Sequence, residues 1–200
     1  FLVPRHAAVL ADEMGLGKSM QAISSIRFLL HTGAARKVLV VCPKGLVSNW
    51  VRELADWAPE VPVAVIEGDP QRRRWQWTLP DVPVKVVNYE SVVRDRDVLA
   101  GSGEPFDLVV LDEAQRVKNA SSQTARAVRA IGRRRSWALT GTPVENSADD
   151  LLGLFDYVAP GQLHERMSPR ELGAACADHV LRRTKDKVLE DLPPRLNRDE

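Results

Sequence analysis

The chain contains little cysteine, little excess charge and no long apolar run. Its 200 residues include two cysteines, Cys42 and Cys176, which form no disulfide framework and suit a reducing compartment. The formal net charge is +1, so any surface that binds nucleic acid must be local. No segment is apolar enough to cross a membrane and no signal peptide is visible, so we expect no membrane partner.

Two classes of hydrolase are excluded by what the chain lacks. The four histidines do not cluster with cysteines at zinc spacing, and His164-Glu165 has no second histidine four residues after the first. No serine lies in a nucleophile-elbow pattern. The length allows one domain with a substantial core. Because the chain begins at Phe1 and not at methionine, we expect it to be part of a longer protein.

Short apolar runs alternate with segments of helical spacing. We expect strands at residues 7–10, 37–42, 63–66, 84–89, 108–111 and 136–140. We expect helices at residues 20–30, 47–58, 91–99, 121–131, 148–158 and 168–177. Such alternation predicts an α/β fold with a mostly parallel sheet and right-handed crossovers. Residues 69–83, rich in arginine and tryptophan, read either as a base-stacking platform or as an amphipathic helix, and we favour the helix.

Residues 11–19 read as a phosphate-binding loop between the first strand and the first helix. Glycines let the backbone curl around phosphate oxygens, Lys18 supplies a compact positive charge, and the Ser19 hydroxyl is a magnesium ligand. Asp12 stands where the usual pattern has glycine. An ordinary strand-to-helix turn is the alternative. The residues expected to bind nucleotide are Asp12, Glu13, Met14, Gly15, Leu16, Gly17, Lys18 and Ser19.

A pair of acids follows the apolar strand at residues 108–111. Acids at the end of a buried strand are costly unless they bind something, and a magnesium-nucleotide complex is the natural partner. We expect Asp112 to hold the metal, Glu113 to activate the attacking water, and Gln115 to contact the terminal phosphate. The alternative is that the acids cap a helix.

These motifs occur in the order found in a known family. The chain resembles the first RecA-like lobe of a Swi/Snf-type ATPase, in the chromatin-remodelling branch of helicase superfamily two. The matching blocks are residues 11–23, 38–53, 87–91, 111–119, 139–146, 181–185 and 191–194. The Asp-Glu-Ala-Gln form at residues 112–115 looks more like bacterial relatives. The resemblance implies a three-layer P-loop NTPase lobe, with an ATP-binding core at residues 1–160, a helical extension at 161–195 and a linker at 196–200.

The resemblance also assigns cofactors and further site residues. ATP and Mg²⁺ would bind at the phosphate-binding loop and the acid pair. Residues 140–142 resemble the motif that couples the nucleotide site to DNA: Thr140, Gly141 and Thr142. Three strand-end segments would contact double-stranded DNA through Lys44, Ser48, Asn49, Trp50, Tyr89, Glu90, Ser91, Lys118 and Asn119. The alternative for Ser48, Ser91 and Asn119 is helix capping.

The expected function is that of a DNA-stimulated ATPase that translocates along double-stranded DNA or remodels proteins bound to it. The adenine-recognising segment would precede Phe1, and a second RecA-like lobe would supply arginine fingers, so we expect the isolated chain to be nearly inactive. A strand-separating helicase or restriction motor is one alternative. A nucleotide-gated protein-interaction module without turnover is another. A bacterial protein of this kind would be cytoplasmic, and a eukaryotic one nuclear.

Overall fold

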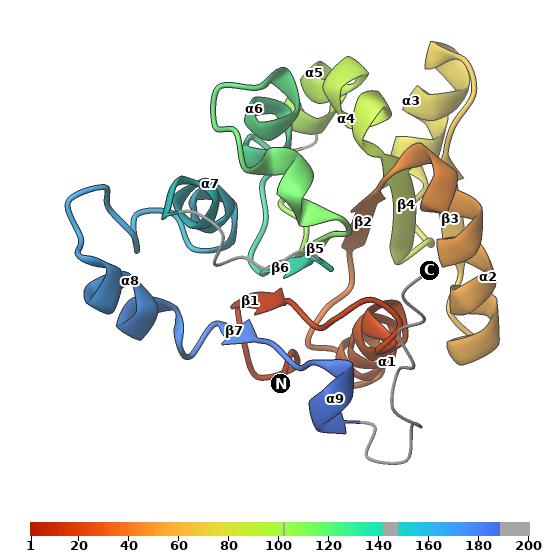
Figure 1. Ribbon diagram of the computed structural model, residues 1–200. Coiled ribbons are helices and arrows are strands. Elements are labelled where there is room, and N and C mark those ends of the chain that lie inside the picture. The colour runs from red at the N-terminus through yellow and green to blue at the C-terminus, as the bar shows by residue number, and fades with distance from the viewer. Residues whose placement is uncertain (102, 142–147, 189–200) are drawn as a thin grey trace, which may run out of the picture.

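A seven-stranded parallel sheet forms the centre of the computed structural model, which describes residues 1–101, 103–141 and 148–188 (Figure 1). The strand order is β3-β4-β2-β5-β6-β1-β7, and every paired neighbour runs parallel. The strands are β1 (Ala7–Leu10), β2 (Val38–Cys42), β3 (Val63–Ile66), β4 (Val84–Asn88), β5 (Leu108–Leu111), β6 (Ser136–Leu139) and β7 (Val180–Leu181). The predicted α/β fold with a mostly parallel sheet is confirmed.

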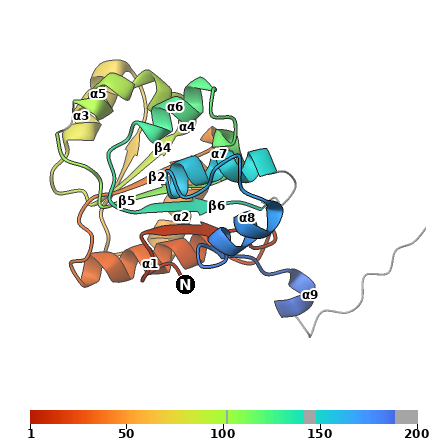
Figure 2. The same ribbon diagram turned by 90° about the vertical axis from the view of Figure 1, so that its left-hand side faces the viewer.

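Helices cover both faces of the sheet and complete three layers (Figures 1 and 2). One apolar core lies between the sheet and helices α1 (Lys18–His31) and α2 (Val47–Trp57). The other core lies under the helices of the opposite face. Those helices are α4 (Tyr89–Arg94), α5 (Arg96–Ala100), α6 (Gln123–Arg129), α7 (Ala148–Val158) and α8 (Pro169–Cys176), with α3 (Pro70–Thr78) and α9 (Lys185–Val188) at the periphery.

The central strands are apolar except for Ser136 of β6, as suits strands that helices cover on both faces. All residues of β2, β5 and β6 are buried. Two short 3₁₀ segments follow the central strands: η1 (Lys44–Leu46) after β2 and η2 (Ala114–Val117) after β5. The carboxyl ends of β1, β2, β5 and β6 meet at one edge, which is where ligands bind in open parallel sheets.

A helix is confirmed for part of residues 69–83, because α3 covers Pro70–Thr78. Asp69 caps this helix by accepting hydrogen bonds from the backbone N–H groups of its first turn. Arg73 and the Trp77 indole both donate to the buried Asp95 carboxylate, whereas the side chain of Trp75 is exposed. The helix expected at 91–99 divides into α4 and α5 at Asp95, which lies between them.

Strand β7 was not predicted, and it changes the description of the segment after residue 160. The segment was expected to be helical, but Val180 and Leu181 pair with Val9 and Leu10 of β1 and extend the sheet. A run of two half-buried residues gives no periodicity to detect. The expected linker at 196–200 lies outside the described residues.

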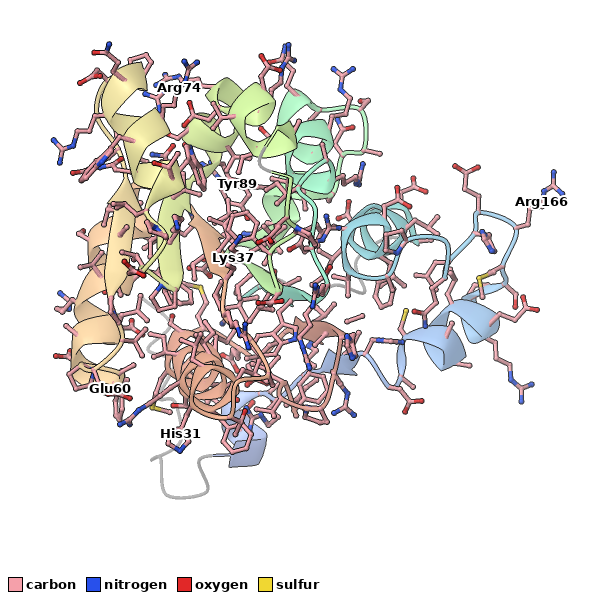
Figure 3. The ribbon with its side chains drawn as sticks, turned by 180° about the vertical axis from the view of Figure 1, so that it is seen from behind. His31, Lys37, Glu60, Arg74, Tyr89 and Arg166 are labelled. Atoms are coloured by element: carbon pink, nitrogen blue, oxygen red, sulfur yellow. The ribbon has the colours of Figure 1, made fainter. Side chains whose placement is uncertain are left out.

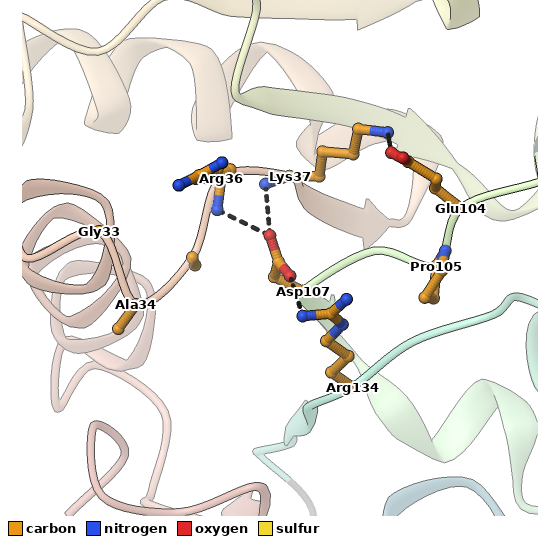
Figure 4. Close-up of a pocket in the computed structure, with 9 residues that line it drawn as sticks. Gly33, Ala34, Arg36, Lys37, Glu104, Pro105, Asp107 and Arg134 are labelled. Carbon is orange, nitrogen blue, oxygen red and sulfur yellow. Dashed lines mark hydrogen bonds and ion pairs between the residues drawn. The ribbon is translucent and has the colours of Figure 1, made fainter.

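A cavity of about 480 Å³ lies at the amino ends of the strands, opposite the candidate ligand edge (Figure 4). Charged side chains that pair with one another line it. Asp107 accepts hydrogen bonds from the backbone N–H groups of Arg36 and Lys37 and forms an ion pair with Arg134 at 3.6 Å. Lys37 pairs with Glu104. These contacts tie three loops together and leave the carboxyl edge as the candidate site. Among the described residues no helix is long and apolar enough to span a membrane.

Candidate nucleotide-binding site

The loop between β1 and α1 has the curled backbone of a phosphate-binding loop. Gly15 and Gly17 have φ angles of 88° and 71°, which side chains other than hydrogen rarely tolerate. Lys18 starts α1, and its Nζ donates hydrogen bonds to the carbonyl oxygens of Asp12 at 2.8 Å and of Glu13 at 3.4 Å. The lysine therefore folds back across the loop that it follows.

The Asp12 side chain is buried against Arg183 and Gln21, so it is not free to bind a nucleotide, which corrects its assignment to the nucleotide site. Its carboxylate has no exposed surface and accepts hydrogen bonds from the backbone N–H, Nε and Nη2 of Arg183. Gln21 also donates to it, at 3.2 Å, and accepts from Arg183 at 2.6 Å. Burial acts to raise the pKa of Asp12, but the bonds from Arg183 and Gln21 hold it below 3.8.

The segment after β7 lies along the phosphate-binding loop (Figure 1). The Glu13 N–H donates to the Arg183 carbonyl at 2.9 Å, and the Lys185 N–H donates to Glu13 Oε2 at 2.8 Å. A Cβ on Gly15 would lie 3.4 Å from Lys185 Nζ. Arg183 lies in the matching block at residues 181–185, and no role was predicted for it, because no local pattern indicates which distant carboxylate it contacts.

The acid pair follows β5 directly. Asp112 Oδ2 accepts a hydrogen bond from the Trp50 indole at 2.8 Å, and Oδ1 accepts from the Glu113 N–H at 3.0 Å. Burial raises the pKa of the Asp112 carboxyl above 3.8, as does the Glu113 charge, whereas the Trp50 bond and the Lys18 charge oppose this. Glu113 has a φ of 50° and does not cap η2 with its side chain, so the helix-capping alternative is wrong for it.

A chain of hydrogen bonds joins the acid pair to the next strand. Gln115 Nε2 donates to Glu113 Oε2 at 2.6 Å, and the Thr140 hydroxyl at the end of β6 donates to Gln115 Oε1 at 3.0 Å. A Cβ on Gly141 would lie 3.6 Å from Lys18 Nζ. The structure thus brings the phosphate-binding loop, the acids and two of the three expected coupling residues together. Thr142 lies outside the described residues.

The residues expected to contact DNA divide into exposed and buried sets. The exposed ones are Lys44, Ser48, Glu90, Lys118 and Asn119. Glu90 pairs with Arg116 at 3.0 Å and Lys118 pairs with Asp150 at 3.0 Å. Asn49 is half-buried and donates to Glu53 of the same helix.

Trp50, Tyr89 and Ser91 are buried, which corrects their assignment as DNA contacts. Trp50 is 0% exposed, Tyr89 1% and Ser91 5%. Figure 3 shows Tyr89 among the side chains inside the molecule, whereas Arg166 extends away from it. The capping alternative for Ser48, Ser91 and Asn119 is also wrong. Residue Leu46 precedes α2 without a side-chain cap, and α4 and α6 are capped by Asn88 and Ser122.

The donor set fits a magnesium nucleotide. A buried carboxylate whose pKa is raised lacks a full positive counterion, and a hydroxyl, Ser19, follows Lys18 at the start of α1. Within the described part of the chain no cluster of three or more histidine, cysteine or acidic side chains could hold a metal ion by itself. A cation that keeps several water ligands and binds through phosphates suits this arrangement.

Comparison with known proteins identifies the family. DNA excision repair protein ERCC-6-like from Danio rerio is 34% identical over 166 residues, which are 80% of this chain and 11% of that protein. An uncharacterized ATP-dependent helicase of Mycoplasma genitalium is 33% identical over 98% of this chain and 20% of its own length. The chain therefore spans a fifth or less of these two relatives.

Two solved structures resemble this chain in both fold and sequence. The Sulfolobus solfataricus SWI2/SNF2 ATPase core in complex with dsDNA superposes with a TM-score of 0.83 and 32% identity, over 94% of this chain and 42% of that chain. The same core domain in a second structure gives a TM-score of 0.78. A family model described as the SNF2-related domain matches residues 3–168. The chain belongs to the SNF2-related family, as the order of its motifs predicted.

Proposed function

We propose that this chain is the ATP-binding lobe of a DNA-stimulated ATPase that moves along double-stranded DNA or displaces proteins bound to it. The observation that carries the proposal is the convergence of Lys18, Asp112 and Thr140 at one sheet edge, where Gln115 bonds both Glu113 and Thr140. Support comes from relatives whose names include DNA repair and chromatin remodelling, and from the likeness to an ATPase core solved with dsDNA.

The roles of the side chains follow from their positions. Glycine-loop amides and Lys18 would bind the phosphates, while Ser19 and Asp112 would hold Mg²⁺. Bound Mg²⁺ supplies charge neutralisation at the phosphates. Glu113 Oε2, now hydrogen-bonded to Gln115, would take the proton of the attacking water. Thr140 bonds the same glutamine, so a change at the terminal phosphate would reach β6 through Gln115.

The exposed strand-end residues suit sequence-independent contacts with a phosphate backbone. Lys44 and Ser48 follow β2, and Lys118 and Asn119 follow η2, at the edge that also carries the nucleotide site. Backbone amides, hydroxyls and single lysines make such contacts without reading bases. A second RecA-like lobe would complete the site with arginine side chains, which stabilise the transferring phosphate. The bacterial origin suggested by residues 112–115 stays a prediction.

Two substitutions test this proposal. We expect Lys18→Ala in the intact protein to lower ATP affinity by about tenfold or more, because the loop loses its charge for phosphate. We expect Glu113→Gln to keep ATP affinity within about twofold and to lower turnover by about 10²–10⁴-fold, because the proton acceptor is lost. Calorimetry measures the affinity and phosphate release measures the turnover.

Glu165→Gln is the control for these substitutions, and two results would contradict the proposal. Glu165 is exposed and lies in the connection between α7 and α8, so Glu165→Gln should change neither quantity. Unchanged turnover in Glu113→Gln would remove Glu113 from the mechanism. Tight ATP binding without any turnover in the wild-type protein would favour the nucleotide-gated interaction module.

A further inference from the structure

Two side chains that are each at most 1% exposed, Trp50 and Tyr89, hold the proposed metal ligand in place. Asp112 is 8% exposed, and its carboxylate accepts the Trp50 indole N–H at 2.8 Å. Its backbone carbonyl accepts the Tyr89 hydroxyl at 2.8 Å. One contact fixes the carboxylate and the other fixes the main chain at the same residue. Neither side chain can touch DNA, yet both belong to strand-end segments that reach the surface.

Trp50 connects Asp112 to the segment after β2. It lies in α2, which begins at Val47 directly after the 3₁₀ segment η1. Lys44 of η1 and Ser48 of the first turn are exposed at the carboxyl edge. Because Ser48 and Trp50 lie two residues apart in the first turn of α2, about 3 Å along its axis, a shift of one moves the other. A ligand that moves the first turn of α2 therefore changes the indole-to-carboxylate hydrogen bond.

Tyr89 makes the equivalent connection from the segment after β4. It is the first residue of α4, and its neighbour Glu90 is exposed. Arg116 of η2 pairs with Glu90 at 3.0 Å and lies 5.5 Å from the centre of the Tyr89 ring. Contact at Glu90 or Arg116 therefore acts on the ring whose hydroxyl holds the Asp112 carbonyl.

We propose that Trp50 and Tyr89 are positioning residues that hold Asp112 for the cation and transmit contact with a double-stranded phosphate backbone from two surface segments to it. This inference rests on the proposed function, since it needs the cation at Asp112. Groups that orient a metal ligand commonly change metal affinity by 10–100-fold when they are removed. The proposal assigns the two buried aromatic residues to the nucleotide site and not to the DNA surface.

The chain offers a matched control for each residue. Trp137 is also 0% exposed, lies in the same apolar core as Trp50, and donates its indole N–H to the Arg5 carbonyl at 3.1 Å. Tyr157 is 0% exposed and donates its hydroxyl to the Val109 carbonyl at 2.9 Å. Replacing either by phenylalanine removes one buried donor and leaves Asp112 untouched.

The test measures the Mg²⁺ concentration needed for half-maximal binding of a fluorescent ATP analogue by the intact protein, with and without a short DNA duplex. We expect Trp50→Phe to raise this concentration about tenfold and Tyr89→Phe to raise it several-fold, whereas Trp137→Phe and Tyr157→Phe stay within about twofold of wild type. We also expect the duplex to lower the concentration in wild type and both controls, but not in Trp50→Phe or Tyr89→Phe.

Two outcomes overturn the proposal, and they are distinguishable. If each variant matches its control in Mg²⁺ dependence and in response to the duplex, the two side chains act only in packing and the inference fails alone. If wild-type binding of the nucleotide does not depend on Mg²⁺, the proposed function fails with it. Because two variants test Asp112 independently, the loss of folding in one of them still leaves the other to decide.

Discussion

At the scale of single residues, Asp12 explains an apparent defect of the phosphate-binding loop. The position that usually carries glycine carries a carboxylate here, and that carboxylate accepts hydrogen bonds from Arg183 and Gln21. The aspartate at this position thus joins the phosphate-binding loop to the segment after β7 through Arg183. A buried charge of this kind is tolerated because every oxygen has a donor.

We predict that Asp12→Asn destabilises the protein by about 1–3 kcal/mol at about pH 7, because Arg183 loses its anionic partner. The folded-state pKa of Asp12 is lowered, so its contribution is present above the ordinary value of 3.8 and is lost as the pH falls through the lower folded value. The difference from wild type should therefore narrow below about pH 4. Urea unfolding at several pH values measures this difference.

Asp56→Asn is the control for that prediction. Asp56 lies in α2, as an exposed residue, and the change should stay within about 0.5 kcal/mol at every pH. An equally small difference for Asp12→Asn would show that the Arg183 contact contributes nothing to the fold, and a difference independent of pH would show that the Asp12 charge is not its source.

At the scale of elements, helix α7 approaches η2 more closely than a side chain would allow. Gly153 lies in α7, and a Cβ placed there would lie 1.8 Å from the Lys118 carbonyl oxygen. Arg129 of α6 donates to the Gly153 carbonyl at 2.8 Å, so α6 is bonded to α7 at the same place. The close approach holds the segment that carries Lys118, one of the exposed residues proposed to contact DNA.

We predict that Gly153→Ala destabilises the protein by about 2 kcal/mol or more, because the backbone of η2 must move to admit the methyl group. Gly173 of α8 is the matched control, since a Cβ there meets nothing within 4 Å. Gly173→Ala should instead stabilise by about 0.5–1 kcal/mol through helix propensity. Thermal unfolding distinguishes the two changes, and equal effects would contradict the close contact.

At the scale of the whole molecule, the two edges of the sheet have different roles. The edge at the amino ends of the strands is closed by ion pairs among Asp107, Arg134, Lys37 and Glu104 (Figure 4). The edge at the carboxyl ends carries the loop, the acid pair and the exposed Lys44. This division follows from the parallel topology, which brings every strand-to-helix loop to one side.

We predict that double-stranded DNA raises the ATPase rate of the intact protein and that added salt weakens this effect, because phosphate contacts release counterions. Lys44→Ala should reduce the salt slope of duplex binding by about one. Arg36→Ala, at the opposite edge, should leave the slope unchanged. An ATPase rate independent of DNA would count against the motor and would favour the interaction module.

Much of the fold and half of the site follow from local patterns. Strands β1, β3 and β5 begin and end at the predicted residues, because each is a short apolar run bounded by turn residues. Gly15, Gly17 and Lys18 predict the phosphate-binding loop, because glycine allows a curled backbone and lysine supplies a positive charge. Asp112 and Glu113 predict the metal side of the site, because acids after a buried strand are costly unless they bind something.

The tertiary structure alone decided which way the remaining side chains face. Trp50 and Tyr89 stand in segments that the family resemblance assigned to DNA, yet both point inward to Asp112. Arg183 lies 171 residues from the carboxylate that it binds. Local sequence determines where a strand ends and which residues follow it. Contacts between distant segments depend on the packing of the whole core, which no local pattern encodes.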